Sequence, residues 1–123
     1  MSSENLKPGM TAEIVTVVDD GLVVKHVGGA GVFSTPSMIG LMERASIQAV
    51  QPHLPAGHTT VGFEVHVRHL APTPKGKTVT IRAELLEADG RKLRFKVEAY
   101  DEDKKKVGDG THRRAIVQIQ PKS

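Results

Sequence analysis

Hydrophobic and polar residues alternate along much of the chain, which is the pattern of β-strands with one buried face. Residues 11–18 (TAEIVTVV) are rich in β-branched side chains, and the turn sequence DDG separates them from a short apolar run at residues 22–24. We therefore predict two strands near the N-terminus. The glycine-rich residues 28–31 disfavour regular structure, so we expect a mobile connection or a lid there.

The spacing of hydrophobic residues changes at Thr35 from strand-like alternation to a helical pattern. Thr35 is a residue type that caps helix N-termini, Pro36 suits a first helical turn, and helix formers continue as far as Gln51. We predict one helix of about four turns. Apolar residues cover most of its circumference: Met38, Ile39, Leu41, Met42, Ala45, Ile47, Ala49 and Val50. A helix of this kind has to be enclosed, so we expect strands to wrap around it.

Alternating runs resume after the helix. Residues 59–70 form a long predicted strand, one face of which is expected to pack on the helix. That face contains Val61, Phe63, Val65, Val67 and His69. Two further runs flank Asp89-Gly90, which is a strong hairpin signal, and residues 107–119 form the last predicted strand. Two early glycines in this last run indicate a bulge or the close approach of another backbone.

The order of the predicted elements is β-β-α-β-β-β-β, and a length of 123 residues is close to the commonest size of one domain. Six antiparallel strands around one long, largely apolar helix belong to the α+β class. They predict a hotdog fold, in which an antiparallel sheet wraps around a central helix. We therefore expect a single domain that covers residues 1–123.

Composition excludes several classes of protein. Lys and Arg number 17 against 14 Asp and Glu, and the net charge of +3 is too small to indicate nucleic-acid binding. No segment approaches the roughly 20 apolar residues of a membrane span. The polar residues 1–10 do not resemble a signal peptide, so we expect a cytoplasmic protein. Because the chain has no cysteine, disulfides, thiolate nucleophiles and Cys-based metal sites are excluded.

Two polar residues lie on surfaces that are predicted to face the core. Glu43 falls within the apolar arc of the helix, where a carboxylate needs a route to solvent, a basic partner or a function. His69 shares the helix-facing row of its strand, where it is either a hydrogen-bonded core residue or a catalytic group. His66 points to the opposite face of that strand, so the two histidines do not predict a metal site. Glu43 and His69 are our candidate acid–base pair.

Three further positions are candidates for binding a substrate. Thr35 is the predicted N-cap, and the N–H groups at a helix N-terminus can stabilise an oxyanion or hold an anion. Gly62 lacks a side chain, so its backbone N–H is another candidate oxyanion donor, although a bulge explains a glycine there equally well. Arg114 and exposed lysines are candidates for contacts with phosphates, on charge alone.

These residues occur within stretches that resemble the fluoroacetyl-CoA thioesterase family of hotdog proteins. The stretches are LKPGM at residues 6–10, VFSTPSMIGLME at residues 32–43 and GTHRRA at residues 110–115, with Gly62 and His69 between the last two. In that family, a Thr at the helix start, a Glu two turns later and a His on the next long strand form the catalytic set. The resemblance places these roles on Thr35, Glu43 and His69.

The resemblance also implies an assembly. It implies a homodimer of two hotdog domains side by side, with acyl-CoA sites shared at the interface, and it leaves open whether dimers pair into tetramers. His69 would face either the helix of its own chain or that of the partner. The chain departs from the family in one place. The fluoroacetyl-specific enzyme has a longer lid with a phenylalanine before the helix, where this sequence has the short residues 28–31.

We therefore predict an acyl-CoA thioesterase that uses no separate cofactor, since CoA is part of the substrate. Glu43 would act as nucleophile or as general base on water, His69 would transfer a proton, and Thr35 would orient the reacting groups. The oxyanion would be held near Gly62 or by the helix N-terminus, and Arg114 would contact the CoA phosphates. Two alternatives are a non-catalytic protein that binds acyl-CoA or another small ligand, and a hydratase or dehydratase, whose usual Asp/His constellation is not found here.

Overall fold

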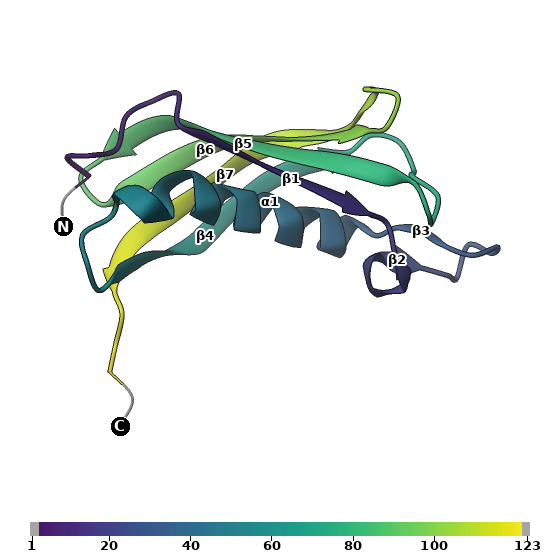
Figure 1. Ribbon diagram of the computed structural model, residues 1–123, viewed down its shortest axis with the longest axis horizontal. Coiled ribbons are helices and arrows are strands. Elements are labelled where there is room, and N and C mark those ends of the chain that lie inside the picture. Colours follow the sequence, from purple (N-terminus) through teal and green to yellow (C-terminus); the bar gives the residue numbers. More distant parts are fainter. Residues whose placement is uncertain (1–2, 122–123) are drawn as a thin grey trace.

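One long helix and a five-stranded sheet make up most of the structure, a computed structural model that describes residues 3–121. The strands are β1 (Thr11–Val17), β4 (His58–His69), β5 (Thr78–Asp89), β6 (Lys92–Asp101) and β7 (Lys106–Gln118). Their order is β1-β5-β6-β7-β4, and all neighbours are antiparallel. The helix α1 (Thr35–Val50) lies along one face of this curved sheet (Figure 1). The predicted α+β class is confirmed, and no helix among the described residues has the length and apolar character to cross a membrane.

The predicted second strand does not belong to this sheet. Only Val23–Val24 is extended; it forms β2, which pairs with β3 (Val32–Phe33) in a separate two-stranded sheet. Leu22 ends the short 3-10 helix η1 (Asp20–Leu22), so two residues of the apolar run are left for the strand. The prediction of six strands around the helix is therefore wrong. The β2–β3 hairpin instead extends past the first turn of α1 (Figure 1).

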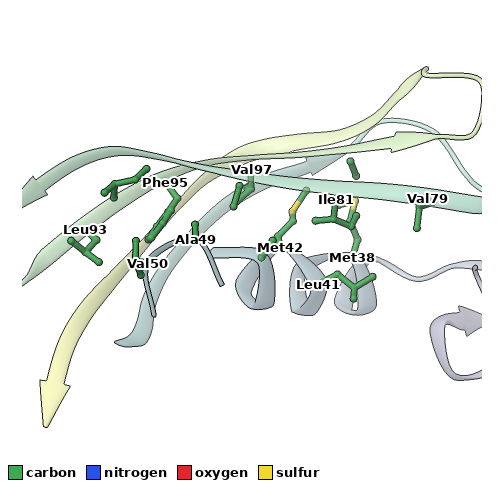
Figure 2. Close-up of a cluster of buried hydrophobic side chains, with 14 of the residues drawn as sticks. Met38, Leu41, Met42, Ala49, Val50, Val79, Ile81, Leu93, Phe95 and Val97 are labelled. Atoms are coloured by element: carbon green, nitrogen blue, oxygen red, sulfur yellow. The ribbon is translucent and has the colours of Figure 1, made fainter. Parts of the chain in front are cut away.

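The core lies between one face of α1 and the inner face of the sheet. The buried residues of the helix are Met38, Leu41, Met42, Ala45, Ser46, Ala49 and Val50. Their sheet partners include Val79 and Ile81 of β5 and Leu93, Phe95 and Val97 of β6 (Figure 2). Ile39 and Ile47 are only half-buried. Within one chain, the curved sheet therefore covers one side of the helix, and the other side is left partly exposed. After Val50, the short 3-10 helix η2 (Gln51–His53) leads toward β4.

Strand β4 lies at an edge of the sheet and contains an irregularity. Its register with β7 shifts between Gly62 and Glu64, so Phe63 is the extra residue of a β-bulge. The bulge reverses the alternation of faces. Gly62 and His69 therefore both face the helix, although they are seven positions apart and strict alternation would place them on opposite faces. Val61 and Phe63 were predicted to face the helix, but they are 48% and 49% exposed. That prediction is wrong because strict alternation does not continue through a bulge.

The two glycines of β7 mark close approaches, as predicted. A Cβ on Gly110 would collide with the β4 backbone at His66 and Val67, and a Cβ on Gly108 would collide with the sulfur of Met38. Glycine at these positions allows β7 to lie tightly against both β4 and α1.

Candidate active site

Thr35 and His69 meet where the start of the helix and the end of β4 come together. Ser34 caps the helix, since its Oγ accepts a hydrogen bond from the Ser37 N–H at 3.1 Å, so the predicted cap role of Thr35 is wrong. Thr35 is the first helical residue, and its hydroxyl is left for another partner. Thr35 Oγ1 and His69 Nδ1 are 2.8 Å apart. The structure thus joins two predicted site residues by a direct hydrogen bond.

The surroundings of His69 favour its neutral form. The ring packs edge-on against Phe33, with 6.0 Å between ring centres, and burial lowers the pKa of His69 below the ordinary value of 6.5. Nε2 is buried and has no hydrogen-bond partner in the part of the chain that the structure describes. A neutral imidazole with one bonded nitrogen and one unpaired nitrogen can exchange a proton with a ligand.

A cavity of about 330 Å³ opens beside this pair. Its polar lining includes Thr35, His69 and His26, and apolar side chains make up most of the rest. The connection between β2 and β3 contributes His26 and Val27, so the segment around the glycine-rich residues 28–31 borders the cavity. The volume falls within the range of about 300–1,000 Å³ that is usual for small-molecule sites.

Glu43 lies apart from this cavity, further along α1. Its Oε2 is 3.6 Å from Arg114 Nη1 and 3.9 Å from His112 Nε2, both on β7. The Glu43 side chain is 40% exposed, so the carboxylate has both a basic partner and access to solvent. Within residues 3–121 of one chain, no hydrogen bond or ion pair joins Glu43 to Thr35 or His69. The structure therefore brings together only two of the three predicted catalytic residues.

Gly62 lies where the side chains of Glu43, His112 and Arg114 converge. A Cβ on Gly62 would be 2.9 Å from Glu43 Oε2, 2.9 Å from His112 Cε1 and 3.0 Å from Arg114 Nη1. Such contacts would displace the neighbours, so the convergence depends on glycine. The bulge interpretation of Gly62 is confirmed, because the register shifts directly after it, while the role of its N–H as an oxyanion donor stays a prediction.

Arg114 is enclosed by the protein, with 4% of its surface exposed. Its Nε donates to Thr60 Oγ1 at 2.7 Å, and its Nη2 donates to the Thr60 carbonyl at 2.8 Å. Burial lowers the pKa of Arg114 below its ordinary value, and the Glu43 carboxylate opposes that shift. A side chain held in this way does not reach the surface. The burial of Arg114 therefore gives no support to the contact with CoA phosphates, which was predicted on charge alone.

Sequence similarity identifies the family. Residues 11–120 match the family of fluoroacetyl-CoA-specific thioesterases. The chain belongs to this thioesterase family. A fluoroacetyl-CoA thioesterase from Streptantibioticus cattleyicolor is 43% identical over 89 residues, which cover 72% of this chain and 63% of that protein. The match therefore spans less than two thirds of the length of that relative.

Solved structures of thioesterases share the fold of this family member. A fluoroacetyl-CoA thioesterase structure has a TM-score of 0.85 and 35% identity, over 94% of this chain and 91% of that chain. A thioesterase superfamily member from Thermus thermophilus has a TM-score of 0.84 and 29% identity, over 94% of this chain and 86% of that chain. The predicted hotdog fold is confirmed.

The sequence interpretation missed His112 and Thr60, which belong to the polar cluster around Arg114. Alternation along β7 places His112 and Arg114 on the same face as the buried Ile116. That signal was present in the sequence and marks both polar residues as pointing inward. Thr60 gave no such signal, because its contact with Arg114 depends on how β4 and β7 are paired.

Proposed function

We propose that this member of the thioesterase family hydrolyses an acyl-CoA thioester to a free acid and CoA. Membership of the family supports the thioester chemistry. The observation that carries the proposal is the 2.8 Å contact between Thr35 and His69 at the wall of the cavity. His69 Nε2 has no partner among the described residues and is available to a reacting group.

In the proposed reaction, either water activated by Glu43 or the Glu43 carboxylate itself adds to the thioester carbonyl carbon. The carbon–sulfur bond then breaks. His69 accepts a proton on Nε2, from the Glu43 carboxyl group in the water route or from solvent in the nucleophile route, and gives it to the departing CoA sulfur. If Glu43 is the nucleophile, water hydrolyses the resulting anhydride and regenerates the carboxylate. N–H groups at the start of α1, beside the cavity, and at Gly62 are the proposed donors to the oxyanion. CoA takes part only as a portion of the substrate.

Two chains form the proposed site together. Glu43 is eight positions after Thr35, and at about 1.5 Å per residue their Cα atoms are about 12 Å apart along the helix. Among the described residues of one chain, the ion pairs of the Glu43 carboxylate are with Arg114 and His112 on β7, not with His69. We therefore assign Thr35 and His69 of one chain and the carboxylate of the partner's Glu43 to the same thioester.

The exposed edge of the sheet supports a homodimer. Strand β4 has 12 residues and ends the sheet, so within residues 3–121 one of its edges has no neighbouring strand. Val61, Phe63 and Val65 on this strand are 38% to 49% exposed, and Ile39 and Ile47 of α1 are only half-buried. An open strand edge with apolar side chains favours pairing with a second copy about a two-fold axis. We propose β4 as the centre of that interface.

The test is the release of free CoA thiol from a panel of acyl-CoA esters. The panel includes fluoroacetyl-CoA, acetyl-CoA and longer aliphatic and aromatic esters. Wild type is assayed beside Glu43→Gln and His69→Ala, with Glu87→Gln at an exposed position of β5 as the matched control. We expect at least one ester to be cleaved. Both site variants should lower kcat by about 100-fold or more, while the control stays within about twofold.

Other outcomes assign other functions. If CoA esters bind but none is cleaved, the protein is a binding protein and the thioesterase proposal fails. If an enoyl-CoA gains or loses water with its thioester intact, as mass spectrometry would show, the protein is a hydratase or dehydratase. If cleavage survives both site substitutions, the activity stands but Glu43 and His69 do not carry it.

A further inference from the structure

Arg114 is the centre of a buried hydrogen-bond network that the reaction above leaves without a role. Two of its nitrogens donate to Thr60, at 2.7 Å and 2.8 Å, and the third, Nη1, lies 3.1 Å from His112 Nε2. Thr60 is on β4 and His112 is on β7, and the two strands are paired here. Three anchors fix both the position and the plane of a guanidinium. The direction of Nη1 is therefore set by the sheet.

The hydrogen bonds of His112 determine which of its nitrogens carries the proton. His112 Nδ1 is 2.8 Å from the Glu64 carbonyl oxygen, and a carbonyl can only accept, so Nδ1 is the donor. In the neutral ring, Nε2 is then the acceptor for Arg114 Nη1. Burial lowers the pKa of His112, and the charge of Arg114 adds to this. The Glu64 carbonyl and Glu43 act in the opposite direction but leave the pKa below 6.5. His112 is thus neutral near pH 7.

The guanidinium that is held in this way faces Glu43. Its Nη1 is 3.6 Å from Glu43 Oε2, and Gly62 leaves the space in which the side chains meet. This distance is that of an ion pair and is longer than a good hydrogen bond. The carboxylate is therefore attracted to one place, while its 40% exposed side chain is still accessible to a substrate.

We infer that Arg114 is a positioning residue: Thr60 and neutral His112 hold its guanidinium, and the guanidinium holds the Glu43 carboxylate above Gly62. The role of Glu43 in catalysis rests on the proposed function, whereas the contact between Arg114 and Glu43 is independent of it. A reacting group that is already held in place gives up less conformational freedom in the transition state. The effect should therefore appear in kcat and not in KM.

The kinetic test compares Arg114→Lys and Thr60→Val with a matched control, Arg113→Lys. Arg113 directly precedes Arg114 on β7, and its side chain is 46% exposed and pairs with Glu64. We expect Arg114→Lys to lower kcat about tenfold or more with KM within about twofold, and Thr60→Val to do the same more weakly. The control should keep both constants within about twofold of wild type. An unchanged kcat in Arg114→Lys, or a change in KM alone, would overturn the inference.

Two structural measurements test the contact itself. Crystal structures of wild type and Arg114→Lys should show the Glu43 carboxylate beside Gly62 in the first and displaced from it in the second. The same carboxylate position in both overturns the inference, even if wild type cleaves no thioester and the proposed function has failed. Nitrogen-15 spectra of histidine-labelled wild type need no variant. They should show a hydrogen on His112 Nδ1 and none on Nε2 at pH 7, and the opposite tautomer or a doubly protonated ring would also overturn it.

Discussion

The Thr35–His69 pair and the Glu43–Arg114 cluster both adjoin α1, yet their surroundings differ. At the helix start, one contact of 2.8 Å joins Thr35 to His69, His69 Nε2 has no partner in the described chain, and a cavity opens beside them. At mid-helix, Arg114 makes two hydrogen bonds to Thr60, and its third nitrogen is directed at His112 and Glu43. The first region thus contains a buried ring nitrogen without a hydrogen-bond partner, whereas in the second region the guanidinium nitrogens of Arg114 all have partners.

This difference indicates separate tasks for the two regions. A buried polar atom without a partner costs stability, so a folded protein retains one mainly where a ligand can satisfy it. A fully bonded network instead fixes geometry. We therefore expect substitutions at the helix start to affect activity much more than stability. Substitutions at the mid-helix cluster should affect both.

The largest expected effect is on turnover at the helix start. His69→Ala removes the proposed proton-transfer group and should lower kcat by about 100-fold to 10,000-fold. His66→Ala is the matched control, because His66 lies on the same strand and its side chain is 71% exposed. Steady-state kinetics on the best ester, together with thermal melting of both variants, tests the prediction. Equal kcat values in the two variants would remove His69 from the mechanism.

The next effect is on stability at mid-helix. Arg114→Met leaves the Thr60 carbonyl and His112 Nε2 without their donor, and it should lower the free energy of unfolding by about 2–4 kcal/mol. Arg113→Met, on the exposed face, should change it by no more than about 0.5 kcal/mol. Urea denaturation measures both values. If the two variants are equally stable, the network around Arg114 does not stabilise the fold.

A smaller effect on kcat, at Thr35, distinguishes a loss of activity from a loss of stability. Thr35→Val keeps the shape of the side chain but removes the hydroxyl that contacts His69, and it should lower kcat about tenfold. Because that contact is exposed, the free energy of unfolding should fall by less than about 1 kcal/mol. Thr35→Ser restores the hydroxyl and should recover most of the rate. A loss of stability as large as that of Arg114→Met would contradict the proposed division.

The smallest effect is a pH dependence of stability. Burial lowers the pKa of both His69 and His112 in the folded chain. Below pH 6.5, these two side chains are therefore protonated more fully in the unfolded chain than in the folded chain. The free energy of unfolding should therefore fall as pH drops from about 6.5 toward the folded pKa values. The lowered pKa values of Asp20 and Glu98 act only below their ordinary values of 3.8 and 4.5. Urea denaturation between pH 7 and pH 5 tests this, and stability that is flat or rises on acidification contradicts it.

Much of the fold could be predicted because its patterns are local. The helix, the long strands and the Asp89-Gly90 hairpin follow from periodicity and turn chemistry. The errors arose where tertiary pairing decides. The bulge at Phe63 is a matter of register with β7, so alternation alone put Val61 and Phe63 on the wrong face. Likewise, residues 22–24 were too few to reveal that they pair outside the main sheet.

The candidate site shows the same limit. His69 could be placed on the helix-facing side of its strand, and Thr35 could be placed at the start of the helix, because each position follows from its own element. Which hydroxyl caps the helix was not decided by residue type, since Ser34 and Thr35 are both good caps. The burial of Arg114 depends on neighbours from three elements, and its charge alone pointed to the surface.

The most direct test of the shared site is complementation between two inactive chains. Heterodimers of a His69→Ala chain with a Glu43→Gln chain can be isolated through different affinity tags and assayed for CoA release. If His69 of one chain works with the partner's Glu43, each heterodimer keeps one intact site and should show about half of wild-type activity. Heterodimers that are folded and bind the ester but release no CoA would contradict the account, because the two residues would then have to act within one chain.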